Sequence, residues 1–273
     1  MTIEPVDSFV AVPGGRIFTR RWTSAQADRP PIVLLHDSLG SVDQWREFPA
    51  ALANATGRSI VAYDRLGFGR STRRAESPSV AFIREEAEIF FPAISQALDI
   101  SNFLLFGHSV GGAMALVIAA LHRGGCEAVT TEAAQAFVEP RTISGIQAAK
   151  KAFRDPEQFA RIAKWHGENA RWVLEAWTEV WLSLEFRAWS LEPYLGRVRC
   201  PVLAIHGDMD EYGSEDFPRR IREGVSGPSE LEIVIGCGHV PHRERQNEVL
   251  RLTSSFISRY CSHTAAVGPE RGA

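Results

Sequence analysis

The sequence predicts an α/β fold built on a mostly parallel sheet. Short apolar runs of strand length recur along the 273 residues and alternate with helix-like segments. The runs are nearly continuous in Val, Ile, Leu and Phe, which is typical of strands covered on both faces, as in a parallel sheet. Because strands and helices alternate, we expect right-handed crossover connections.

Each element follows from its local pattern. Pro13-Gly14-Gly15 separates Phe9–Val12 from Arg16–Trp22 and predicts an antiparallel hairpin at the sheet edge. The further strands are expected at Ile32–Leu35, Ile60–Tyr63, Phe103–Phe106, Ala128–Thr131, Val202–Ile205 and Leu231–Ile235. The helices between them are expected at Trp45–Asn54, Val80–Leu98, Ser109–His122, Phe217–Glu223 and Gln246–Tyr260.

One region breaks the alternation. Residues 136–195, called the cap segment below, contain helical patterns such as ARWVLEAWTEVWLSLEF and no strand-like run. We expect a helical cap inserted in a core of residues 1–135 and 196–262, followed by a flexible tail at 263–273. Most tryptophans of the cap segment are expected to pack within it. Some are expected to face a substrate pocket, and the candidates are Trp165, Trp177 and Trp181.

Composition excludes several function classes. The net charge is −3 and no basic block occurs, so nothing indicates a nucleic-acid partner. The start, MTIEPVDSFV, lacks a signal-peptide pattern, and the longest apolar segment, Val110–Leu121, is too short to span a bilayer. Four widely spaced cysteines favour a reduced, cytoplasmic setting without a metal site. We expect no cofactor and no membrane partner; monomer and homo-oligomer both stay open.

A serine between glycines follows the run Phe103–Phe106. The sequence Gly107-His108-Ser109-Val110-Gly111 fits a strand–turn–helix nucleophile elbow, although a plain tight turn uses the same letters. In an elbow, the glycines remove side chains that would collide with the neighbouring strand and helix. The serine hydroxyl is then exposed at the carboxyl edge of the sheet.

A serine nucleophile needs a base and an orienting carboxylate. His239 follows the last strand in IVIGCGHVPHRE and is the preferred base, whereas His242 is expected to cap the next helix or to lie at the pocket rim. Asp210, in the loop after Val202–Ile205, is the preferred acid over Asp208. Glu132, at the end of Ala128–Thr131, is the alternative acid or a solvated residue at the pocket rim.

The negative charge that develops during acyl transfer needs two amide donors. The elbow supplies the N–H of Val110, and the loop His36-Asp37-Ser38-Leu39-Gly40-Ser41 supplies the second, with Ser38 preferred over Leu39. Asp37, Leu39 and His108 are also expected to line the pocket. Four cationic side chains of the cap segment are candidates for binding a substrate carboxylate or belong to a solvated face: Arg141, Lys164, His166 and Arg171.

At this point the chain resembles the α/β-hydrolase superfamily. The order Ser109, Asp210, His239 matches that family, and YDRLGFGRS resembles its D-x-x-G-x-G-x-S loop. HDSLGS resembles its His-Gly oxyanion loop, GCGHVPHRE its histidine loop, and the cap segment its usual cap position. The resemblance covers the chain to about residue 260. Asp37 departs from the pattern, because the family usually has glycine after the histidine.

The resemblance implies a serine hydrolase that cleaves a carboxylic ester or lactone through an acyl-enzyme. Family members with the same constellation also include hydrolases of C–C bonds in meta-cleavage diketones and cofactor-free dioxygenases. A non-catalytic receptor on the same fold is a further alternative, which the intact Ser109, Asp210 and His239 disfavour. Dehalogenases and epoxide hydrolases use an aspartate nucleophile, so both are disfavoured. The tryptophans of the cap segment predict a small, largely apolar substrate.

Overall fold

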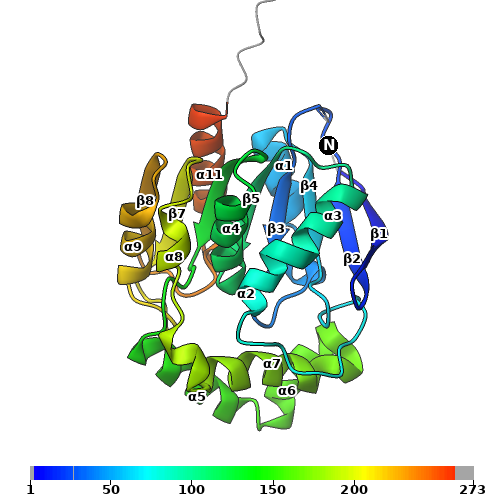
Figure 1. Ribbon diagram of the computed structural model, residues 1–273, viewed down its shortest axis with the longest axis vertical. Helices are drawn as coiled ribbons and strands as arrows, with labels where there is room; N and C mark the ends of the chain where they lie inside the picture. Colours follow the sequence, from blue (N-terminus) through cyan, green and yellow to red (C-terminus); the bar gives the residue numbers. More distant parts are fainter. Residues whose placement is uncertain (1–2, 27, 262–273) are drawn as a thin grey trace, which may run out of the picture.

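A computed structural model describes residues 3–26 and 28–261, so the tail predicted at 263–273 lies outside the described residues. Within them, the chain forms one eight-stranded sheet of order β1-β2-β4-β3-β5-β6-β7-β8 (Figure 1). The strands are β1 (Pro5–Val12), β2 (Gly15–Trp22), β3 (Ile32–Leu35), β4 (Ile60–Tyr63), β5 (Phe103–His108), β6 (Cys126–Glu132), β7 (Val202–Gly207) and β8 (Ser229–Val234).

The sheet is parallel from β4 through β8, and β1 and β2 form the antiparallel hairpin at one edge. Consecutive residues of each parallel strand point to opposite faces. In β3, Val33 and Leu35 join the core on one face, whereas Ile32 and Leu34 join the core on the other. The predicted α/β class with strands buried on both faces is therefore confirmed.

Helices cover both faces of the sheet (Figure 1). The face of Ile32 packs against α1 (Phe48–Thr56) and α11 (Gln246–Tyr260). The opposite face is covered by α2 (Phe82–Glu85), α3 (Phe91–Ala97), α4 (Val110–Leu121), α8 (Glu192–Leu195) and α9 (Asp216–Gly224). The helix expected at Val80–Leu98 differs, because a π-helical turn at Glu86–Phe90 separates α2 from α3. Pro92, at the start of α3, lacks the N–H that a continuous α-helix would use there.

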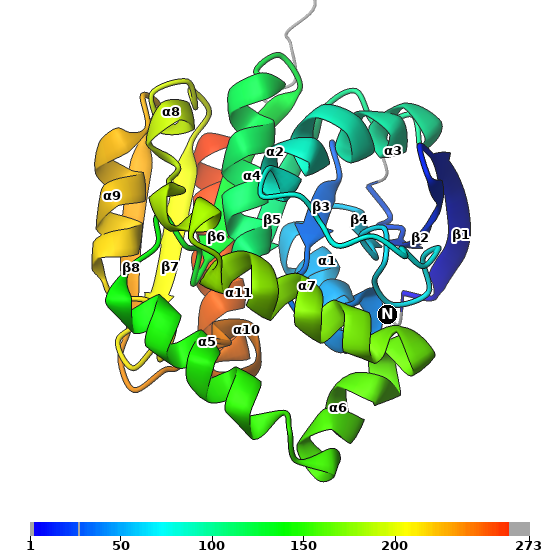
Figure 2. The same ribbon diagram turned by 60° about the horizontal axis from the view of Figure 1, so that its bottom comes forward.

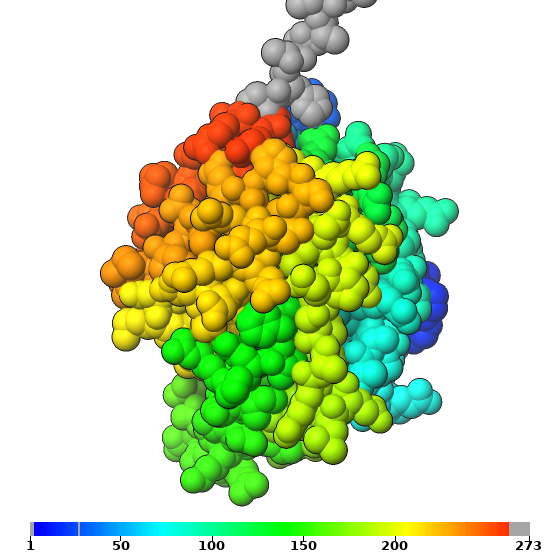
Figure 3. All heavy atoms as spheres, turned by 60° about the vertical axis from the view of Figure 1, so that its left-hand side comes forward, coloured from blue at the N-terminus to red at the C-terminus, as the bar shows by residue number. Residues whose placement is uncertain are grey.

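The cap segment lies between β6 and β7 in the chain and consists mainly of α5 (Pro140–Ala152), α6 (Pro156–His166) and α7 (Ala170–Leu182). These helices lie together beyond one end of the sheet (Figure 2). Seen from the side of β8 and α9, the green residues of the cap segment form the lower part of the molecule (Figure 3). No helix within residues 3–26 and 28–261 combines the length and apolarity that crossing a membrane requires.

Candidate active site

Ser109 occupies a strained turn between β5 and α4. Its φ of 57° and ψ of −125° are rare for a residue with a side chain, and its N–H donates to the carbonyl oxygen of Glu132 at 2.8 Å. A Cβ at Gly107 would lie 2.2 Å from the carbonyl oxygen of Gly111, and one at Gly111 would lie 2.1 Å from that of Leu35. Both glycines are therefore required by close backbone approach, as in a nucleophile elbow.

The loops after β7 and β8 bring a carboxylate and an imidazole to this serine. His239 Nε2 lies 3.0 Å from Ser109 Oγ, and His239 Nδ1 lies 2.9 and 2.8 Å from the two carboxylate oxygens of Asp210. Asp210 also accepts the N–H groups of Tyr212 at 2.7 Å and Gly213 at 3.2 Å. Burial raises the pKa of Asp210, but the charge and hydrogen bond of His239 outweigh it, so this pKa is lowered. The carboxylate therefore stays ionised beside Nδ1–H.

The two alternative acids, Asp208 and Glu132, form hydrogen bonds with groups other than His239. Asp208 Oδ1 accepts the N–H of Gly236 at 2.7 Å and that of Cys237, which fixes the turn leading to His239. Glu132 is buried, not solvated, and pairs with His242 Nδ1 at 2.5 Å. His242 is likewise buried, not a helix cap or a rim residue, because α10 (Pro241–Glu244) turns it into the core.

Two backbone amides lie near the serine: Val110 follows Ser109 in the chain, and Ser38 lines the same cavity as Ser109. Within the described residues, neither the N–H of Val110 nor that of Ser38 donates to a protein acceptor. The N–H of Leu39 is instead used by Asp37 Oδ1 at 3.0 Å, which disfavours Leu39 as the second donor. The side chain of Asp37 thus shapes the loop as an Asx turn and leaves the Ser38 amide free.

Asp37 also links this loop to the histidine loop through His108. His108 Nε2–H donates to the carbonyl oxygen of His239 at 2.7 Å, while its Nδ1 lies 3.4 Å from Asp37 Oδ2. Burial lowers the pKa of His108, but Asp37 raises it more, so this pKa is raised; that of Asp37 is lowered. Both ring nitrogens of His108 therefore face acceptors, which favours a buried ion pair under the site.

His108, Glu132 and His242 also place one ligand atom each within 4.8 Å of the others, a spacing that a metal ion can occupy. Burial lowers the pKa of His242, so its ring is neutral and Nδ1–H is available to Glu132. His108 donates its Nε2–H to a carbonyl oxygen and His242 Nδ1 pairs with Glu132 Oε2, so both histidines have hydrogen-bond partners. Glu132 Oε1 is buried without a hydrogen-bond partner.

A cavity of about 220 Å³ opens in front of Ser109. Trp177 and Trp181 of α7 line it as expected, together with Asp37 and Leu39. Trp165 does not line it, because it lies on α6 under the Lys164 ammonium group, and His108 lies behind the site in the core. Residues of the lining that the sequence did not single out are Gln135, Thr142, Ile146, Glu211, Tyr212 and Val240.

Gln135 is the most relevant of these. Its amide Nε2 lies 3.1 Å from Ser109 Oγ, and its Oε1 lies 3.3 Å from the same hydroxyl. The available signal was its position three residues after Glu132, where β6 ends at the same sheet edge as the serine. Gln135 therefore contacts the hydroxyl of Ser109 and lines the cavity beside it.

The four cationic candidates of the cap segment have structural contacts instead of cavity positions. Arg141 donates to the carbonyl oxygens of Asp210 and Gly213, each at 3.3 Å. Lys164 and Arg171 lie over aromatic rings, and His166 bonds two core loops. Arg141 therefore supports the loop of Asp210, and none of the four lines the cavity.

Comparisons with known proteins agree with the observed fold. A sequence model of the family described as alpha/beta hydrolase fold matches residues 30–246. A proline iminopeptidase from Lactobacillus helveticus is 22% identical over 278 residues, which cover 88% of this chain and 94% of that protein. An sn-1-specific diacylglycerol lipase from Xenopus laevis is 26% identical, over 84% of this chain and 80% of the lipase. The solved 2-hydroxy-6-oxo-6-phenylhexa-2,4-dienoate hydrolase from Rhodococcus superposes with a TM-score of 0.77 at 19% identity, over 94% of this chain and 99% of that one.

Proposed function

The chain belongs to the α/β-hydrolase family, and from that premise we propose that it is a serine hydrolase cleaving carboxylic esters or lactones. Ser109 is the proposed nucleophile, His239 the general base and Asp210 the orienting acid. The observation that carries the proposal is this unbroken chain of contacts beside two unpartnered amides, those of Val110 and Ser38. A nucleophile, a general base, an orienting acid and a pair of oxyanion donors are what acyl transfer to serine requires.

In the proposed mechanism, Ser109 Oγ attacks the substrate carbonyl carbon while His239 Nε2 accepts the hydroxyl proton. Asp210 holds Nδ1–H and stabilises the imidazolium. The amides of Val110 and Ser38 donate to the oxyanion, and each is worth about 3 kcal/mol of transition-state stabilisation. His239 then protonates the leaving alkoxide, and a water activated by the same ring hydrolyses the acyl-enzyme.

The substrate class follows from the lining. Trp177, Trp181 and Ile146 supply apolar walls, and Gln135 and Thr142 supply polar groups next to the serine. A cavity of about 220 Å³ with this lining suits a small ester with an apolar portion. The same constellation serves C–C bond and amide hydrolysis, and a substrate panel distinguishes these reactions from ester cleavage.

A substrate panel on the purified protein tests the proposal. The panel contains p-nitrophenyl esters, a lactone, a meta-cleavage diketone and a prolyl p-nitroanilide, each assayed with wild type and Ser109→Ala. We expect ester or lactone turnover that falls by a factor of 10³ or more in Ser109→Ala, on the order of the losses seen for triad members. Turnover confined to the diketone or the anilide contradicts the ester proposal, and unchanged ester turnover in Ser109→Ala contradicts the nucleophile. Oxygen uptake with a quinolone panel tests the dioxygenase alternative.

A further inference from the structure

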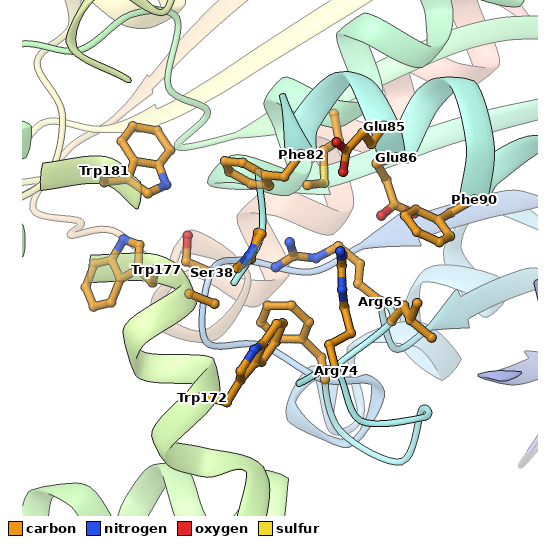
Figure 4. A pocket seen from close by; sticks show the side chains of 15 residues that line it. Ser38, Arg65, Arg74, Phe82, Glu85, Glu86, Phe90, Trp172, Trp177 and Trp181 are labelled. Carbon is orange, nitrogen blue, oxygen red and sulfur yellow. The ribbon is translucent and has the colours of Figure 1, made fainter. Parts of the chain in front are cut away.

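A second, smaller space lies next to the cavity in front of Ser109. Ser38, Trp177 and Trp181 line both, so only these residues lie between the two spaces at that point. The smaller space, called the inner pocket below, has a volume of about 30 Å³, which is room for about two waters or one carboxylate group. Its remaining lining includes Arg65, Phe68, Arg74, Phe82, Glu86 and Trp172 (Figure 4).

Arg65 is a buried cation without a carboxylate partner. Arg65 lies in the loop that follows β4 and is only 5% exposed. Nη2 donates to the carbonyl oxygen of Asp37 at 2.7 Å, and the guanidinium lies 4.1 Å from the centre of the Phe68 ring. Nε is buried and has no hydrogen-bond partner, and within the described residues no carboxylate oxygen lies within 4.0 Å of the group. Burying a charged group without an ion-pair partner costs free energy, and a bound anion would supply that partner.

The acidic residues of the inner pocket have other partners. Glu86 accepts the hydroxyl of Tyr63 at 2.7 Å, and Glu85 accepts that of Ser79 at 2.5 Å. Burial lowers the pKa of the Arg65 guanidinium and the charge of Glu86 opposes that shift at longer range, whereas burial raises the pKa of Glu86 itself. Figure 4 shows the guanidinium of Arg65 pointing to the middle of the lining residues, with Arg74 below it in the view. Arg65 Nε is therefore left without a protein partner beside the inner pocket.

The direction of entry follows from the proposed chemistry. His239 protonates the leaving group, so the leaving group lies on the His239 side of the serine. His239, Val240 and Tyr212 line the outer cavity but not the inner pocket. The acyl chain therefore extends the other way, past Ser38 and between Trp177 and Trp181.

Resting on the proposed function, we propose that Arg65 binds a carboxylate at the far end of the acyl chain. The preferred substrates are then hemiesters of dicarboxylic acids, which are cleaved to the diacid and an alcohol. A guanidinium is a strong donor to a carboxylate, and the buried Nε–H of Arg65 has no protein acceptor. The apolar side chains of Ile146, Trp177 and Trp181, which line the larger cavity of about 220 Å³, provide the walls for the intervening methylene groups.

The test compares esters matched in chain length. The p-nitrophenyl hemiesters of adipate, pimelate and suberate are set against p-nitrophenyl hexanoate, heptanoate and octanoate. For at least one length, we expect wild type to prefer the hemiester at least about tenfold in kcat/KM. In Arg65→Gln, this preference falls by about 10- to 100-fold, the value of a hydrogen bond to a charged group. The ratio is the readout, because Arg65 also supports Asp37 and its loss lowers both rates.

Arg70→Gln is the matched control, because it removes the same charge from the same loop. Arg70 lies outside the inner pocket, where it packs over the ring of Phe18 and pairs with Asp7. This variant is expected to leave the preference unchanged. An Arg65→Gln protein that keeps the wild-type preference overturns the carboxylate site. If this variant fails to fold, inhibition of wild type decides: adipate must compete at least tenfold more tightly than hexanoate, and equal inhibition overturns the site. Ser109-dependent cleavage without acid preference refutes the site alone, whereas Ser109-independent cleavage refutes the proposed function.

Discussion

Glu132 and Asp210 follow neighbouring strands, yet they hold different histidines. Asp210 contacts His239, and Glu132 contacts His242. We therefore predict that Asp210→Asn lowers kcat by a factor of roughly 10⁴, because the amide no longer holds the Nδ1–H tautomer or the imidazolium. Glu132→Gln is expected to cost stability instead, about 1–3 kcal/mol, because its amide satisfies the buried His242 less well.

Steady-state kinetics and urea unfolding of both variants check this prediction. Loss of activity in Glu132→Gln together with retained activity in Asp210→Asn would reverse the assignment of the acid. Sequence reasoning ranked the two carboxylates by strand-end position. It missed that Glu132 is fully buried, because the partner that buries it, His242, lies 110 residues away.

Asp37 departs from the family pattern for a reason that the geometry supplies. It turns the oxyanion loop through Leu39 and pairs with His108, which in turn holds the carbonyl of His239. The raised pKa of His108 means that its contribution to stability is complete below the unfolded pKa near 6.5 and is lost as pH rises through the folded pKa. The lowered pKa of Asp37 means that its contribution is present above the unfolded pKa near 3.8.

We predict that Asp37→Asn lowers the free energy of unfolding by about 1–3 kcal/mol. The difference from wild type is expected to be largest between about pH 4 and 6.5 and to shrink as pH rises further. Urea unfolding at several pH values measures it. A difference that stays constant with pH, or grows above pH 7, would contradict the ion pair.

Among the elements, those buried on both faces were the most predictable. The predicted bounds of β3 and β4 match the structure because an uninterrupted apolar run has few other uses in a soluble α/β protein. The single helix predicted at Val80–Leu98 was wrong, since periodicity does not reveal the π-helical turn that precedes Pro92. The elbow was predictable from Gly107 and Gly111 because backbone contact leaves no space for side chains there.

We predict that Gly111→Ala damages both stability and activity. Its Cβ would contact the Leu35 carbonyl at 2.1 Å, so α4 and the end of β3 must separate. This displaces the amides of Val110 and Ser38, and the expected cost is about 2–4 kcal/mol in stability with at least tenfold in kcat. Gly124→Ala is the control, because nothing lies within 4 Å of its Cβ position. Equal thermal stability and kcat of the two variants would contradict the close approach.

At the scale of the whole molecule, the cap segment is attached to the core through His166. Its Nδ1 accepts the N–H of Gly69 at 2.9 Å, and its Nε2–H donates to the carbonyl oxygen of Leu39 at 2.9 Å. Burial lowers the pKa of His166, which keeps the ring neutral as this pair of bonds requires. Sequence reasoning treated His166 as a substrate ligand or a solvated residue, because the fold alone determines what faces it.

We predict that His166→Phe loosens the cap segment while retaining the aromatic contact with Phe68. The two backbone groups lose their partner, at a cost of about 1–3 kcal/mol each. Amide hydrogen exchange in α6 is expected to accelerate, and KM for esters to rise, because Leu39 lines the cavity. Lys164→Ala, which removes an exposed neighbour, serves as the control. Unchanged exchange in His166→Phe would show that this attachment is unimportant.

The proposed triad could be predicted from the sequence, whereas the pocket between the cap segment and the core could not. The proposed triad follows from strand ends and loop order, both of which are local. The pocket depends on how α6 and α7 lie over the core, and this arrangement puts Trp177 and Trp181 in the cavity lining but not Trp165. Arg65 went unnoticed for the same reason, since its burial depends on residues from distant segments.

The most direct test of the central claim is covalent labelling of the nucleophile. A fluorophosphonate reacts with a serine that an adjacent base and oxyanion donors activate. We predict that mass spectrometry finds one equivalent of label on Ser109 in wild type and none in Ser109→Ala. Absence of label on Ser109 in a folded wild-type protein, or labelling elsewhere that persists in Ser109→Ala, would contradict the proposed serine hydrolase.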